Sequence, residues 1–68
     1  MAWQYRVRTP DGNELGRRML RANDEAIRWV LELVMPSAPT QYDFLVLEAE
    51  SAPGDWEYVE NVQRSKAD

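Results

Sequence analysis

The sequence predicts an α+β fold in the order β-β-α-β-β, with a four-stranded antiparallel sheet that carries one helix on one face. Three observations predict it. Polar and apolar residues alternate over residues 3–9, apolar residues recur at helical spacing over 24–35, and two extended runs after residue 41 are joined by a short turn. Two hairpins that flank one helix most simply form a single antiparallel sheet covered on one side.

The first hairpin is predicted from residues 3–9 and a second strand at about 13–22. The turn between them is Thr9-Pro10-Asp11-Gly12, in which proline suits the second position and glycine accepts a positive φ. If Gly12 is the bulge residue of this turn, the pairing of the two strands is fixed. The predicted pairs are Thr9 with Asn13, Arg8 with Glu14, Val7 with Leu15, Tyr5 with Arg17 and Trp3 with Met19.

The helix is predicted over residues 24–35, because Asn23 is a favourable N-cap and Pro36 prevents continuation. Its predicted core residues follow the spacing i, i+3, i+4, i+7 and are Ile27, Val30, Leu31 and Val34. Three further apolar residues, Ala26, Trp29 and Leu33, widen the apolar arc to about 240°. One face of a sheet cannot cover an arc of that width.

The second hairpin is predicted from a strand at 42–50, a turn at 51–55 and a strand at about 56–62. The ubiquitin-like β-grasp arrangement has the same order of elements and is the alternative fold. The short Pro-Gly turn, which is typical of a true hairpin, favours the plain antiparallel sheet. Residues 1–63 are then one domain, and residues 64–68 form a polar tail that we expect to be disordered.

A chain of 68 residues has a small core, with a net stability of roughly 3–5 kcal/mol. Disulfides and a structural zinc site are excluded, because the chain has no Cys and no His. Oligomerisation is the remaining common means of stabilising so small a domain. No apolar run approaches the length of a membrane span and no leader sequence is visible, so we expect a cytoplasmic protein; seven Arg against one Lys favours a bacterial or phage origin.

The charge is divided by position along the chain. Residues 1–22 sum to +3, whereas residues 23–68 sum to −7, for a total of −4. An Arg-rich first hairpin could therefore attract the acidic second hairpin, within one chain or between copies. The predicted charged interaction residues are Arg6, Arg18, Glu48, Glu50, Glu57 and Glu60.

The apolar residues that the fold leaves over predict a contact surface. The predicted apolar interaction residues are Trp29, Leu33, Ala26, Trp56 and Tyr58. Large aromatic residues such as Trp are over-represented as energetic anchors of interfaces. The alternative is that the loop at 36–41 or the C-terminal tail folds over the helix flank.

Little in the sequence predicts catalysis. Glu48 and Glu50 lie two apart on a strand, a spacing of about 7 Å that is similar to paired catalytic carboxylates, but no nucleophile and base accompany them. We expect no catalytic residue, cofactor or metal. The leading hypothesis is a non-enzymatic protein–protein interaction module that self-associates as a homodimer; the alternative is nucleic-acid binding through Arg6, Arg8 and Arg18.

Overall fold

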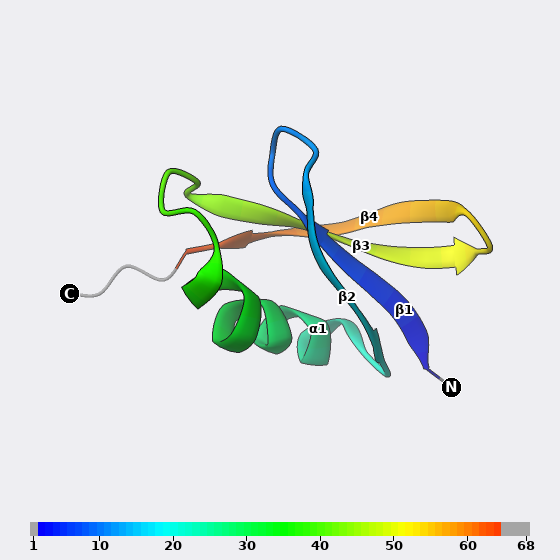
Figure 1. The fold of residues 1–68 in the computed structure, drawn as a ribbon. Helices are drawn as coiled ribbons and strands as arrows, with labels where there is room; N and C mark the ends of the chain where they lie inside the picture. Colours follow the sequence, from blue (N-terminus) through cyan, green and yellow to red (C-terminus); the bar gives the residue numbers. More distant parts are fainter. Residues whose placement is uncertain (1, 65–68) are drawn as a thin grey trace.

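The computed structural model describes residues 2–64, and it confirms the α+β class with one helical segment on one face of a four-stranded sheet (Figure 1). The strands are β1 (Trp3–Arg8), β2 (Glu14–Leu20), β3 (Phe44–Ala52) and β4 (Asp55–Gln63). The helical segment comprises α1 (Asn23–Trp29), a π-helical turn η1 (Val30–Val34) and a 3₁₀ turn η2 (Met35–Ser37).

The sheet has the order β2-β1-β3-β4, and each neighbouring pair is antiparallel. The two central strands, β1 and β3, are thus antiparallel, and the β-grasp alternative is wrong. Of the predicted tail, only Arg64 lies within the described residues, and its backbone N–H donates to the carbonyl of Asp43 at 2.8 Å. No helix in residues 2–64 is long and apolar enough to cross a membrane.

The turn of the first hairpin forms as predicted, but the register beyond it does not. Gly12 has φ +102°, and Arg8 lies opposite Glu14. A bulge then shifts the pairing by one residue, so that Val7 lies opposite Gly16 instead of the predicted Leu15. The shift places a residue without a side chain beside Val7, where the indole of Trp29 covers it.

The shifted register also replaces the other predicted pairs along β2. Trp3 lies opposite Leu20 rather than Met19, and Tyr5 opposite Arg18 rather than Arg17. Because facing residues of an antiparallel pair share a side of the sheet, Arg18 lies on the same face as Tyr5, and Arg17 on the other. One bulge therefore decides on which face each arginine of β2 lies.

The buried stripe of the helical segment follows Ala26, Val30 and Met35, at spacings of four and then five residues. Hydrogen bonds in a π-helical turn run from i to i+5, so η1 returns Met35 to the face already occupied by Val30. Leu31, predicted as a core residue, is 38% exposed for the same reason. Pro36 is accommodated because it lies at the start of a new 3₁₀ turn.

The start of α1 is fixed by contacts that differ from the predicted Asn23 cap. The N-cap position is Ala22, and Oδ1 of Asn23 instead accepts a hydrogen bond from the hydroxyl of Tyr5 at 2.8 Å. Oε1 of Glu25 accepts from the backbone N–H of Arg21 at 2.9 Å. Burial raises the pKa of Tyr5, and the carboxylates of Asp24 and Glu25 raise it further. The neutral phenol thus joins β1 to the helix.

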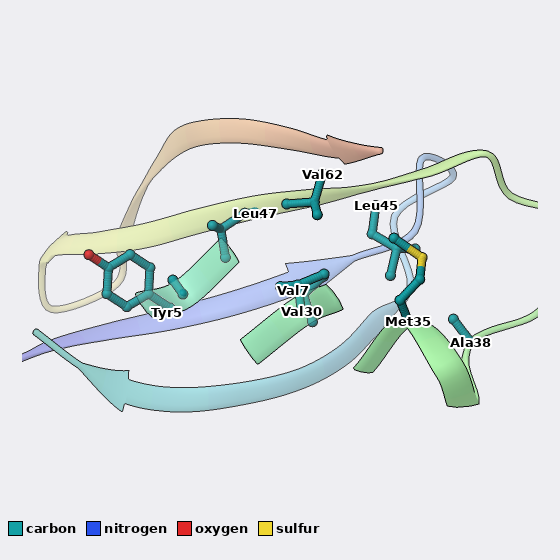
Figure 2. Packing of buried hydrophobic residues seen from close by; sticks show 9 residues of the cluster. Tyr5, Val7, Val30, Met35, Ala38, Leu45, Leu47 and Val62 are labelled. Carbon is teal, nitrogen blue, oxygen red and sulfur yellow. The ribbon is translucent and has the colours of Figure 1, made fainter. Parts of the chain in front are cut away.

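The core lies between the helical segment and the two central strands (Figure 2). Its members are Tyr5, Val7, Ala26, Val30, Met35, Ala38, Leu45, Leu47 and Val62. We call the side of the sheet that carries these residues the helix face, and the opposite side the outer face. Figure 1 shows α1 beneath β2, while the tip of the β3–β4 hairpin projects away from the helix.

Bulges also set the faces of the second hairpin. Val59 is the extra residue of β4, because Leu47 pairs with Glu60 while Glu48 pairs with Tyr58. This places Glu57 and Glu60 on the helix face of β4, although they are three residues apart. The outer-face residues of β4 are Trp56, Tyr58, Asn61 and Gln63.

Candidate protein interface

The outer face carries an ion network at its centre. Nε of Arg6 donates to Oε1 of Glu48 at 2.6 Å, and Nη2 of Arg8 donates to Oε2 of the same carboxylate at 3.0 Å. Arg6 and Glu48 are direct partners across β1 and β3, and the Glu48 side chain is only 11% exposed. The predicted attraction between Arg6 and the acidic hairpin is therefore satisfied within one chain.

Trp56 lies beside this network with two guanidinium groups over its ring. The guanidinium carbon of Arg6 is 4.2 Å from the ring centroid, and that of Arg17 is 5.1 Å away. Nε of Arg17 also donates to Oε2 of Glu14 at 2.7 Å, a bond that lowers the pKa of Glu14 and raises that of Arg17. Trp56, predicted as an apolar contact residue, is half-buried and has cation contacts within the chain.

The nucleic-acid hypothesis places Arg18 on the outer face with Arg6 and Arg8, and this placement is wrong. The bulge places Arg18 on the helix face of β2, where it is exposed and forms no ion pair with any described residue. The three arginines of the nucleic-acid alternative are thus divided between two faces, and two of them already contact Glu48. This arrangement disfavours a common phosphate-binding surface.

The four predicted acidic residues are also divided. Glu48 and Glu50 lie on the outer face, whereas Glu57 and Glu60 lie on the helix face. Glu48 is held by two arginines, and Oε2 of Glu50 accepts from the backbone N–H of Gly54 at 2.8 Å. Residues 2–64 contain no cluster of three or more His, Cys, Asp or Glu side chains arranged to hold a metal ion. Both carboxylates, Glu48 and Glu50, therefore have hydrogen-bond partners within the chain.

The charge split of the sequence becomes a difference between the two edges of the sheet. β2 is one edge; it exposes Arg17, Arg18 and Glu14, of which Glu14 is paired with Arg17, and Arg21 follows directly after the strand. β4 is the other edge; it exposes Asp55, Glu57 and Glu60 and contains no Lys or Arg. Each edge strand also presents backbone groups that lack a partner strand on one side.

An apolar cleft of about 300 Å³ adjoins the β2 edge, which we call the Trp29 cleft. Its lining residues are Leu15, Gly16, Trp29, Leu33, Val34, Ser37 and Ala38. Trp29 is half-buried against Gly16, whereas Leu33 is 58% exposed. Ala26 is fully buried in the core and presents no surface, which corrects its predicted place on the exposed flank.

The alternative, that the loop at 36–41 or the tail folds over the helix flank, stays a prediction; Ser37 and Ala38 line the cleft beside Trp29 and Leu33. Ala38 is only 8% exposed and belongs to the core. Leu33 stays exposed beside it. The sequence analysis missed Leu15 and Gly16 as cleft residues; a glycine inside a strand is the signal that could have found them, since it often marks a bulge or a close approach.

Comparison with known proteins gives no guide to this surface: no family model, no curated protein and no solved structure matches the chain.

Proposed function

We propose that the chain is a non-enzymatic protein-interaction module that self-associates through the edges of its sheet and the Trp29 cleft. The observation that carries the proposal is the position of an apolar cleft directly beside an open, basic strand edge. An open edge provides backbone hydrogen bonds to an added strand, and a neighbouring cleft provides pockets for side chains. The acidic β4 edge of a second copy has the charge that suits this surface.

Exposed apolar side chains support association at the same surfaces. Leu33 beside the cleft is 58% exposed, Met19 on β2 is 57% exposed and Tyr58 on β4 is 62% exposed. Each of these side chains would lose contact with water if a second copy covered the cleft or the sheet edge beside it. Burial of apolar surface is the main favourable contribution to association. A domain with so small a core also gains stability from a partner.

The charges at the edges contribute specificity and speed. Opposite charges on the two surfaces steer the encounter and fix its orientation, and they add less to the affinity itself. Association should therefore slow as the salt concentration rises. Arg6, Arg8 and Glu48 take little part, because their charges are balanced within the chain.

Leu33→Glu is expected to weaken self-association by at least roughly tenfold while the fold is retained, since a charge in an apolar contact must be desolvated. Leu33 is the better probe than Trp29, because Trp29 also packs on Gly16 in the monomer. The measurement is sedimentation velocity over a concentration series, with circular dichroism to confirm folding.

Leu31→Glu is the matched control, because it introduces the same side chain two residues away on a residue that does not line the cleft. This control should assemble like the wild type. If folded Leu33→Glu also assembles like the wild type, the Trp29 cleft is not part of the interface.

A further inference from the structure

We infer that two copies associate head to tail, with the β4 edge of one copy pairing with the β2 edge of the next, so that the sheet continues from copy to copy. This inference rests on the proposed self-association and specifies its geometry. It is carried by two properties of the sheet: the directions of its edge strands and the charges on each face of those strands.

The strand directions permit such a continuation without turning the second copy over. Four strands in consecutive antiparallel pairing leave the two edge strands, β2 and β4, running in opposite directions. A copy displaced sideways in the same orientation therefore brings its β4 antiparallel to β2 of the first copy. The helix faces of both copies then lie on the same side of the continued sheet.

On the helix face this arrangement brings opposite charges together. Arg18 is exposed at the β2 edge, and Glu57 and Glu60 are exposed on the helix face of β4. Glu25 and Glu32 of the helical segment lie near Arg18 with Arg28, and these three sum to −1. Arg18 is therefore the cation at the strand edge itself, and the neighbouring copy's carboxylates are suitable partners for it.

On the outer face the same arrangement brings apolar and aromatic groups to the join. β2 presents Met19 there, and β4 presents Tyr58. Both are more than half exposed in the single chain, whereas the guanidinium of Arg17 is already paired with Glu14 and lies over Trp56. A thioether is a favourable neighbour for an aromatic ring.

Pairing of identical edges is disfavoured by the same charges. Two β2 edges would bring Arg17 and Arg18 near their own copies, and two β4 edges would do the same for Glu57 and Glu60. Like charges across a strand pair are destabilising and act against the wrong arrangement. On the helix face of β4, Glu57 and Glu60 are exposed and can receive a neighbour, whereas Val62 is buried in the core.

A head-to-tail contact does not close on itself at two copies. Each added chain leaves one β2 edge and one β4 edge free, so growth continues until a ring closes or a filament forms. A dimer would then be the first intermediate of assembly.

The test uses charge reversals at single sites: Arg18→Glu on one edge, and Glu57→Lys and Glu60→Lys on the other. Arg18→Glu alone and at least one of the two lysine variants alone should weaken assembly by roughly tenfold, since each places like charges at every join. An equimolar mixture of Arg18→Glu with the lysine variant at the facing site should assemble like the wild type, because both kinds of join then contain opposite charges. The lysine variant that is rescued also identifies the register.

Asp43→Lys is the matched control, since it makes the same charge change at an exposed residue outside both edge strands. It should assemble normally. If Glu57→Lys and Glu60→Lys both assemble like the wild type, or if no mixture restores assembly, the head-to-tail geometry is wrong although the proposed self-association stands. If the wild-type chain itself stays monomeric, the inference and the proposed function both fail.

Discussion

Leu47→Ala is expected to remove most of the stability of the domain at 25 °C, so that a measurable fraction of the chain is unfolded without denaturant. Leu47 is fully buried on the central strand β3, between β1 and β4. Truncation of a buried leucine to alanine costs about 2–5 kcal/mol. The whole domain has a stability of only roughly 3–5 kcal/mol, so this single change removes most of it. The measurement is urea denaturation followed by near-ultraviolet circular dichroism, at a concentration low enough to avoid association.

Leu31→Ala is the matched control for Leu47→Ala. It is the same substitution on a residue that is 38% exposed, and we expect a cost below about 1 kcal/mol. The comparison also tests the winding of η1, because an unbroken α-helix would place Leu31 in the core. A large loss for Leu31→Ala with a small loss for Leu47→Ala would contradict the core described above.

Glu48→Gln is expected to cost about 2 kcal/mol of unfolding free energy. The amide keeps the shape of the side chain but removes the negative charge that lies between Arg6 and Arg8. Loss of one member of a fully buried ion pair costs more than this, but the Arg8 side chain is 33% exposed and water partly compensates. Nη2 of Arg8 bonds to Glu48, whereas Nε of Arg8 is buried without a hydrogen-bond partner among the described residues.

The control for Glu48→Gln is Glu32→Gln, the same change at an exposed helical residue that forms no ion pair with the described residues. It should alter stability by less than about 0.5 kcal/mol. Equal midpoints of urea unfolding for the Glu48 and Glu32 variants would mean that the ion network on the outer face adds nothing to stability.

The elements that depend on local chemistry could be predicted from the sequence. The turn at Pro10 and Gly12 is set by backbone preferences of those residues, and the antiparallel pairing within each hairpin follows from its short turn. The helical segment was also predicted, because Pro36 and the apolar spacing before it are local signals. Each of these features is decided by residues close together in the chain.

The register of β2 and the winding of the helix could not be predicted in this way. The bulge at Leu15 places Gly16 on the helix face, where Trp29, 13 residues after Gly16, packs on it. The π-helical turn places Met35, rather than Leu31, in the core. Such choices are settled by tertiary packing, which overrides local preference.

The bulges also determine on which face of the sheet the predicted site residues lie. A change of one residue in β2 moved Arg18 to the helix face and brought Arg17 to Trp56. The extra residue Val59 placed Glu57 and Glu60 on the same face of the sheet, whereas a regular strand would place them on opposite faces. The charge split along the sequence was therefore informative about the two edges, but not about the individual pairs.

The central claim is that this chain associates with itself, and sedimentation velocity of the wild-type protein from about 1 to 500 μM tests it most directly. The proposed function predicts a weight-average mass that rises with concentration, and the head-to-tail geometry predicts that it passes the mass of a dimer. The rate of association, followed by light scattering after rapid mixing, should fall at high salt. A mass that stays at the 7.9 kDa of one chain over the whole range would contradict the account.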